Sequence, residues 1–271
     1  QGLQIVDGKL YVSTGRYGES RLLRYNFADS RLEGGRKLHP RLWGEGLTVL
    51  GDTLYQLTWR ARLLLVYDRP DLDYRESFAL PGEGWGITHN GRELIYSDGS
   101  HRLHYLAPDS GEYLRSITVT ENGMPVPELN ELEWVDGTIW ANVFRTDRIV
   151  IIDPDTGAVT GGIDLTGLLP AAERRPDTSV LTGIAVDPAD DGIWVTGKRW
   201  PWIYRIELVE PDESAGTRSS GTRSSGTRSS GTRSSGTRSS GTRSSGTRSS
   251  GTNSSGAAAS KPSPHSVSPP E

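Results

Sequence analysis

The chain has 271 residues, a formal net charge of −4 and no cysteine. It therefore cannot form disulfide bonds, and it lacks a thiolate nucleophile and cysteine ligands for a metal. No apolar run approaches the roughly 18 residues that a membrane-spanning helix needs, and no signal peptide is visible. Because the chain starts at Gln1 without a methionine, we expect a processed or truncated protein.

Residues 1–209 read as five similar units of short β-branched or aromatic runs, separated by turns rich in Gly, Asp, Asn and Pro. A common strand phrase recurs every 40 to 54 residues, a period typical of propellers and solenoids. Three or four strands per unit predict an all-β fold, a five-bladed β-propeller. The phrase occupies residues 8–15, 51–59, 91–99, 136–144 and 191–198.

The fifth unit ends near Val209 after three strands, and the chain begins directly with the first inner strand. Propellers often close with a strand borrowed from the N-terminus, so we expect an open or weakened seam between the first and last blades. Only the stretch GLLPAAERR, residues 167–175, predicts a short helical turn.

Residues 210–271 predict a disordered tail, in which GTRSS occurs seven times in succession from Gly216. Such a segment cannot bury enough apolar surface to offset its ordering entropy. From Gly216 onward the tail carries eight basic residues and one acidic residue, a net of +7, so residues 1–215 carry about −11. An acidic head favours neither a nucleic-acid nor a membrane partner. The tail could bind nucleic acid or an anionic surface, or serve as a linker, and its dilute charge favours the linker.

Alignment of the five units predicts a ring of side chains around the propeller axis, because symmetry mates face the same channel. Aromatic walls with a few converging polar groups are typical of a ligand pocket. The ring has two sets of residues. The first set, before the first strand of each unit, is Gln1, Glu45, Trp85, Asn130 and Thr182. The second set, at the end of the second strand, is Gly15, Trp59, Gly99, Phe144 and Lys198, and it follows the first by 14 residues in four units and by 16 in the fifth.

Nine short motifs occur in order between Gln1 and about Leu208: QGL, STG-x-YG, GEGLT, YQLTW, PGEGWG, SDGS, NELEW, WAN and TGK-x-W. Together they resemble the glutaminyl-peptide cyclotransferases of the plant and bacterial type. The resemblance implies a monomeric, exported propeller, periplasmic or secreted, that acts on peptides or proteins with an N-terminal glutamine. It implies conversion of that glutamine to pyroglutamate with release of ammonia, and no cofactor or catalytic metal.

The resemblance also implies the site residues. They are Gln1, Glu45, Trp59, Trp85, Asn130 and Lys198. Phe144 stands where the family usually has tryptophan, and the family usually extends beyond this glutamine with a Phe-Thr pair.

The implied reaction is an attack by the substrate's α-amine on its own side-chain amide, so the protein mainly needs to hold a reactive conformation. We expect Glu45 to take a proton from the amine and return one to the leaving ammonia. Burial beside indoles would raise its pKa above about 4.3. Asn130 and Lys198 can donate to the carbonyl oxygen. The expected substrate-binding side chains are Gln1, Trp59, Trp85 and Phe144.

Structural roles are the alternatives for these residues. Glu45 could cap backbone amides, and Lys198 could pair with Glu45 or Asp98. Asn130 could satisfy local backbone, and the indoles could be core. Glu131 and Glu133 share one strand face, and one of them is a candidate to support Lys198.

Two other functions compete with the cyclotransferase. One is a non-catalytic propeller that binds a protein or ligand at the channel mouth, since propellers host many functions. The other is a metal-dependent propeller hydrolase such as a lactonase. The ring argues against the hydrolase, because only Glu45 and Asn130 could serve as ligands, beside a cationic Lys198.

Overall fold

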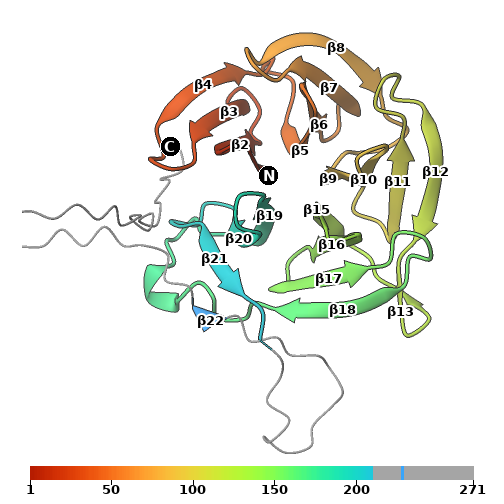
Figure 1. Cartoon of the computed structure of the whole chain (residues 1–271), viewed down its shortest axis with the longest axis vertical. Coiled ribbons are helices and arrows are strands. Elements are labelled where there is room, and N and C mark those ends of the chain that lie inside the picture. Colours follow the sequence, from red (N-terminus) through yellow and green to blue (C-terminus); the bar gives the residue numbers. More distant parts are fainter. Residues whose placement is uncertain (210–226, 229–271) are drawn as a thin grey trace, which may run out of the picture.

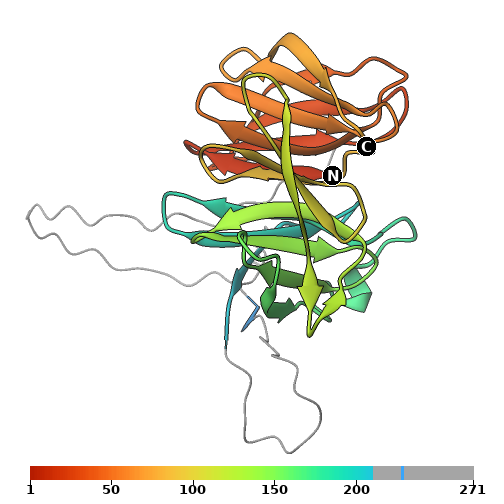
Figure 2. The same cartoon turned by 90° about the vertical axis from the view of Figure 1, so that its right-hand side faces the viewer.

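The structure of this protein is a computed structural model that describes residues 1–209 and 227–228. Apart from Thr227–Arg228, the predicted disordered tail lies outside the described residues. Five four-stranded antiparallel sheets surround a central axis, which confirms the all-β, five-bladed propeller (Figure 1). Figure 2 shows the ring from the side.

In each sheet the strands follow one another in chain order from the axis outward. The first blade consists of β1 (Gly2–Val6), β2 (Lys9–Thr14), β3 (Arg21–Asn26) and β4 (Leu32–Lys37). The second consists of β5 (Gly44–Leu50), β6 (Thr53–Thr58), β7 (Leu63–Asp68) and β8 (Asp73–Ala79). The third consists of β9 (Ile87–His89), β10 (Leu94–Ser97), β11 (Arg102–Leu106) and β12 (Tyr113–Thr118).

The fourth blade consists of β15 (Leu129–Val135), β16 (Thr138–Val143), β17 (Arg148–Ile152) and β18 (Val159–Asp164). The fifth consists of β19 (Leu181–Asp187), β20 (Gly192–Gly197), β21 (Tyr204–Glu207) and β22 (Thr227–Arg228). A small hairpin of β13 (Thr120–Glu121) and β14 (Met124–Pro125) separates the third and fourth blades. The predicted helical turn is the 3-10 helix η1 (Ala171–Glu173). The described residues contain no helix long and apolar enough to cross a membrane.

The turns between the first two strands explain part of the repeat. In the first blade Asp7 and Gly8 have φ of 49° and 68°, and in the fourth Asp136 and Gly137 have φ of 46° and 80°. Two-residue turns with both φ values positive match the right-handed twist of the flanking strands, and Asp-Gly is a favoured pair there. The Asp-Gly signal in the sequence therefore marks tight hairpins next to the axis.

One apolar cluster fills each of the five spaces between blades. Alternate side chains of a strand point to opposite faces of the sheet, so each blade contributes to two clusters. Leu54 packs toward the first blade, whereas its neighbour Tyr55 packs toward the third. The core is thus a ring of five interfaces around the channel.

The seam between the first and last blades is not open. Leu3 and Ile5 of β1 pack with Ala185 and Trp194 of the fifth blade in one buried cluster. The ring of Phe27 meets Trp194 edge to face, with centroids 5.2 Å apart. Packing of the inner strand β1 against the fifth blade therefore closes the ring.

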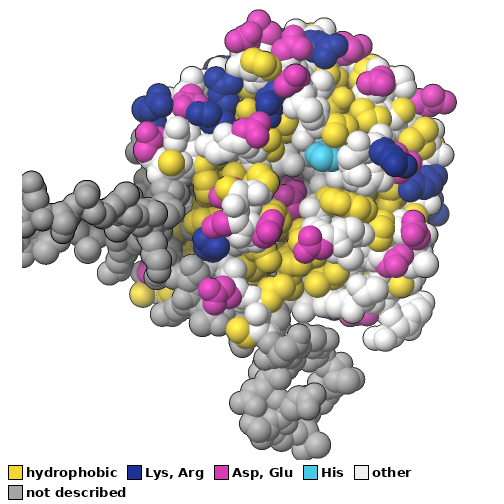
Figure 3. Space-filling model, viewed as in Figure 1, with side chains coloured by type: hydrophobic (Ala, Val, Ile, Leu, Met, Phe, Trp, Pro, Cys, Tyr) yellow, Lys and Arg dark blue, Asp and Glu magenta, His cyan; other side chains and the backbone are white. Residues whose placement is uncertain are grey.

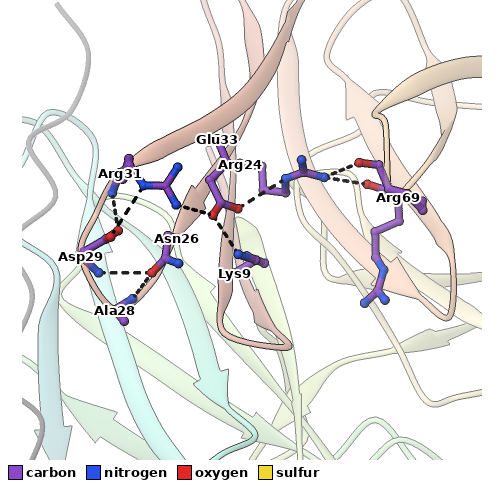
Figure 4. A network of polar contacts seen from close by, with 9 residues as sticks. Lys9, Arg24, Asn26, Ala28, Asp29, Arg31, Glu33 and Arg69 are labelled. Carbon is purple, nitrogen blue, oxygen red and sulfur yellow. Dashed lines mark hydrogen bonds and ion pairs between the residues drawn. The ribbon is translucent and has the colours of Figure 1, made fainter.

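A network of charges links the outer parts of the first two blades (Figure 4). Glu33 lies 2.8 Å from the Lys9 ammonium and 3.1 Å from the Arg31 guanidinium. The guanidinium of Arg24 donates to the carbonyl oxygens of Arg69, at 3.3 Å, and Pro70, at 2.5 Å. These bonds fasten β3 to the loop after β7 and lie away from the channel.

Candidate active site

A β-bulge interrupts the innermost strand in three of the blades. In β5, Glu45 and Gly46 together oppose a single residue of β6. The same shift occurs in β15 and β19, around Asn130 and Thr182. Bulges next to active sites commonly re-aim a side chain. The bulges therefore coincide with three positions of the predicted ring.

The glycine after Glu45 is required by close contact between inner strands. The Gly46 N–H donates to the carbonyl oxygen of Trp85 at 2.7 Å. A Cβ on Gly46 would lie 2.8 Å from Gly86 Cα, and a Cβ on Gly86 would lie 2.1 Å from the Asn130 carbonyl oxygen. Side chains cannot fit at such distances, so both positions need glycine, although the fourth unit has Glu131 at the equivalent position. Backbone packing thus fixes the ring residues around the axis.

The carboxylate of Glu45 lies in a polar cluster at the centre of the ring. With the Gln1 amide oriented so that both its atoms find partners, its nitrogen donates to Glu45 Oε2 at 3.2 Å. Its oxygen accepts from the Trp43 indole and from Lys198 Nζ, both at 3.2 Å. The Lys198 ammonium also lies 5.2 Å from the centroid of the Trp43 ring. The structure therefore brings together three predicted site residues: Gln1, Glu45 and Lys198.

The environment of Glu45 favours its neutral form. Burial of the carboxyl group raises its pKa to about 8, against the opposing positive charges of the Gln1 α-amine and Lys198. The residue nevertheless keeps partial solvent access. A carboxyl group that titrates near neutral pH can both accept and donate a proton under physiological conditions.

Two indoles from neighbouring blades face a common carboxylate. Trp59 follows β6, and Trp85 precedes β9. Their Nε1–H groups donate to the same oxygen, Glu83 Oε2, at 2.7 Å and 3.1 Å. Both indoles are only half-buried, so they are not simply core residues. Their half-exposed faces are suited to bind an apolar part of a ligand.

Further aromatic rings extend this wall. The Phe144 ring meets Trp85 with centroids 5.4 Å apart, and the Trp43 ring meets Trp59 at 5.7 Å. Tyr17 lies edge to face with Trp43 at 5.3 Å. The aromatic contacts therefore form two groups, Tyr17–Trp43–Trp59 and Trp85–Phe144, which Glu83 links through the two indole N–H groups.

Asn130 is buried and held between blades. Its Nδ2 donates to Thr182 Oγ1 at 3.3 Å, and its carbonyl oxygen accepts from Ser97 Oγ at 2.6 Å. The side chain bonds to the neighbouring ring residue rather than to local backbone. A long bond to a hydroxyl can be exchanged for a bond to a ligand at low cost.

Two buried carboxylates continue along β15. Glu131 Oε1 accepts from the Leu3 N–H at 3.3 Å, while its other oxygen has no hydrogen-bond partner in the described part of the chain. Glu133 Oε1 accepts from the Val186 N–H at 3.1 Å. Burial raises the pKa of Glu131 well above its usual value and that of Glu133 to about 8. Their contacts are with backbone of other blades, and neither has a recorded bond to Lys198.

Asp98 has a structural role. Its Oδ1 accepts from the Ser100 N–H at 3.0 Å, and its Oδ2 lies 3.0 Å from His104 Nε2. Burial opposes its ionisation, but the hydrogen bonds from His104 and Ser100 lower its pKa to about 2. The carboxylate is therefore ionised and engaged, unlike that of Glu45.

Within residues 1–209 and 227–228, no group of three or more His, Cys, Asp or Glu side chains is placed to hold a metal ion.

Acidic side chains appear among hydrophobic ones around the centre of the face drawn in Figure 3. This surface agrees with the acidic balance of residues 1–215.

Sequence reasoning missed two residues of the site, Trp43 and Glu83. Each stands two positions before a ring residue, Glu45 and Trp85 respectively. Extending the repeat alignment by two residues toward the N-terminus would have found both.

Comparison with known proteins gives consistent results. The sequence profile described as glutamine cyclotransferase matches residues 1–208. A glutaminyl-peptide cyclotransferase of Arabidopsis thaliana is 35% identical over 212 residues, covering 76% of this chain. The chain spans 66% of the length of that relative. The crystal structure of Myxococcus xanthus glutaminyl cyclase aligns with a TM-score of 0.72 and 33% identity, over 78% of this chain and 91% of the other.

Proposed function

Because this chain belongs to the glutamine cyclotransferase family, we propose that it converts the N-terminal glutamine of peptides or proteins into pyroglutamate. The substrate's α-amine attacks its side-chain amide carbon, the new C–N bond closes a five-membered lactam, and ammonia leaves. The supporting observation is Glu45, a carboxyl group with a pKa of about 8 that touches the amide of Gln1.

Glu45 acts as the proton shuttle in this proposal. Its ionised form accepts the proton that the neutral α-amine nitrogen loses as it attacks the amide carbon. The neutral form then returns a proton to the departing amide nitrogen. One group can do both because its pKa lies near the working pH.

Lys198 and Asn130 stabilise the oxygen of the tetrahedral intermediate. Lys198 Nζ already donates to an amide oxygen, that of Gln1, at 3.2 Å. Among the described residues, the Asn130 amide nitrogen has one bond to exchange, the 3.3 Å bond to Thr182. Donors positioned before reaction stabilise developing negative charge without a reorganisation cost.

The remaining task is to fold the substrate so that its two ends meet. Trp59, Trp85 and Phe144 enclose the glutaminyl side chain, and the amide of Gln1 binds its amide. An intramolecular reaction gains most of its rate from such a conformation.

The test is ammonia release from a short glutaminyl peptide, with and without EDTA, by the wild-type protein and by Glu45→Gln. An N-acetylated peptide serves as the control, because its blocked amine cannot attack. We expect turnover that is insensitive to EDTA, absent with the acetylated peptide and abolished in the variant. No turnover with any free-amine peptide would reject the proposal and favour the non-catalytic binding propeller.

Monomeric state and export to the periplasm or medium are also part of the proposal and are supported only by the family resemblance. Size-exclusion chromatography and fractionation of the producing cells would test them.

A further inference from the structure

Glu83 contacts two half-buried indoles of the site, those of Trp59 and Trp85. A single oxygen, Oε2, accepts from Trp59 Nε1 at 2.7 Å and from Trp85 Nε1 at 3.1 Å. The two indoles belong to different blades, so this oxygen joins the second and third blades at the site. No other hydrogen bond is recorded for either indole N–H among the described residues.

The other oxygen of Glu83 faces solvent and Arg60. Oε1 lies 3.9 Å from Arg60 Nε, and the guanidinium lies 4.0 Å from the centroid of the Trp59 ring. Trp59 is therefore held at its N–H edge by Glu83 and on one face by Arg60. An ion pair this long and exposed contributes little by itself, so the indole bonds are the stronger contacts.

The backbone around Glu83 is fixed. The Gly84 N–H donates to the Thr58 carbonyl oxygen at 3.3 Å, and the Trp85 N–H donates to that of Ser97 at 2.9 Å. A Cβ on Gly84 would meet Leu57 at 3.0 Å. The loop that carries Glu83 is thus pressed against the second blade, which makes its carboxylate a rigid acceptor.

We propose that Glu83 is a positioning residue that holds the Trp59 and Trp85 indoles at the separation needed to enclose a glutaminyl side chain. The inference rests on the proposed function. Hydrogen bonds to an ionised acceptor are stronger than those between neutral groups, and a site on fixed supports keeps its geometry better. Without the acceptor, each indole can rotate about its side-chain bonds and the pocket loses its shape.

The test compares Glu83→Ala, Glu83→Gln and the control Glu121→Ala. Glu121 is a fair match because its side chain is 33% exposed, against 35% for Glu83, and it also pairs with an arginine. In Glu83→Gln the amide oxygen can accept from both indoles, whereas alanine accepts from neither. The Glu83→Gln variant therefore keeps the hydrogen bonds to the indoles and removes the negative charge.

For Glu83→Ala we expect kcat/KM for ammonia release to fall by about ten- to a hundredfold, mainly through KM, from the loss of two charge-assisted bonds. Glu83→Gln should recover most of this loss, and Glu121→Ala should match the wild type. Equal kinetics for the two alanine variants would overturn the proposal. So would a glutamine variant as impaired as Glu83→Ala.

A second measurement keeps the proposal separate from the proposed function. Quenching of tryptophan fluorescence by acrylamide needs no substrate and reports how accessible the indoles are. We expect stronger quenching in Glu83→Ala than in the wild type, Glu83→Gln or Glu121→Ala. If the wild type released no ammonia, the proposed function would fail, while this series would still show whether Glu83 fixes the indoles. Unchanged quenching in Glu83→Ala would reject that role.

Discussion

The side-chain amide of Gln1 donates to the carboxylate of Glu45 at 3.2 Å, although the two residues belong to neighbouring blades. Gln1 stands directly before β1, and Glu45 lies at the bulge of β5. They are symmetry mates in the repeat, and both project into the ring. The pair places an amide against a carboxyl group, which is the contact that the proposed glutaminyl substrate would make.

Replacement of Glu45 by glutamine should leave the fold intact and remove the proton shuttle. Loss of a general acid–base group typically costs about 100- to 10,000-fold in rate, so we expect a drop in kcat of that size. The thermal midpoint should not fall, since the neutral amide resembles the predominantly protonated carboxyl group below pH 8. Steady-state ammonia release and a thermal melt check both points. Residual activity within tenfold of the wild type would contradict the role of Glu45.

The pH dependence of activity should reflect the raised pKa of Glu45. Because burial raises this pKa to about 8, the ionised base is scarce at pH 6 and becomes abundant above pH 8. We therefore expect kcat/KM to rise with pH and to level off above about pH 8.

The substrate's own α-amine titrates in the same range, so kinetics alone cannot identify the group. NMR of isotope-labelled glutamate would follow the carboxyl groups directly, and Glu45→Gln would identify the signal of Glu45. A Glu45 signal that titrates near its usual value of 4.5 would contradict the prediction.

Glu133 should make the fold less stable as the pH rises. In the folded protein, burial raises the pKa of Glu133 from its ordinary value of 4.5 to about 8. A carboxyl group with a raised folded pKa stabilises the fold fully below its unfolded pKa, and this contribution is lost as pH rises toward the folded value. Glu133→Gln keeps an oxygen for the Val186 N–H and removes the ionisation.

We expect Glu133→Gln to melt like the wild type at pH 4 and markedly higher at pH 9, because a pKa raised from 4.5 to about 8 corresponds to several kcal/mol, at about 1.4 kcal/mol per pH unit. Melting curves at the two pH values check this. A difference of the same size at both pH values would show that ionisation is not its cause.

Phe144→Trp should strengthen substrate binding. Phe144 stands where the resembling family usually has tryptophan, and its ring meets Trp85 at 5.4 Å. A larger half-buried ring adds apolar contact, so we expect KM to fall roughly three- to tenfold with kcat nearly unchanged. Steady-state kinetics on one glutaminyl peptide provide the measurement. A rise in KM would mean that the pocket is already full.

The propeller and most of its ring could be predicted because both follow from repetition. Once Leu10, Leu54 and their counterparts set the period, every ring position had four symmetry mates. Glu83 and Trp43 were missed because the alignment stopped two residues short of them. Their roles depend on contacts across a blade boundary, which no periodic pattern displays. The close packing between the first and last blades was not predicted for a similar reason, because Leu3 and Trp194 come into contact only when the ring closes.

Gly15→Ala should displace Trp43 and thereby weaken both the fold and the site. A Cβ on Gly15 would lie 2.2 Å from Trp43 Nε1 and 2.4 Å from the Gly44 carbonyl oxygen. Neither position allows an atom, and overpacking of this kind typically costs about 1–3 kcal/mol. Because the Trp43 indole donates to the Gln1 amide, its displacement should also loosen the partner of Glu45.

The matched control is Gly161→Ala, because Gly161 lies on β18, the outermost strand of the fourth blade. A Cβ at this position would lie at an ordinary contact distance of 3.4 Å from Ile151. We expect a lower thermal midpoint and a reduced kcat/KM for Gly15→Ala, and wild-type values for Gly161→Ala. Thermal melts and ammonia release on both variants provide the comparison. If Gly15→Ala lost stability but kept full activity, the contact between Trp43 and Gln1 would have no part in the reaction, because the substitution must move that indole.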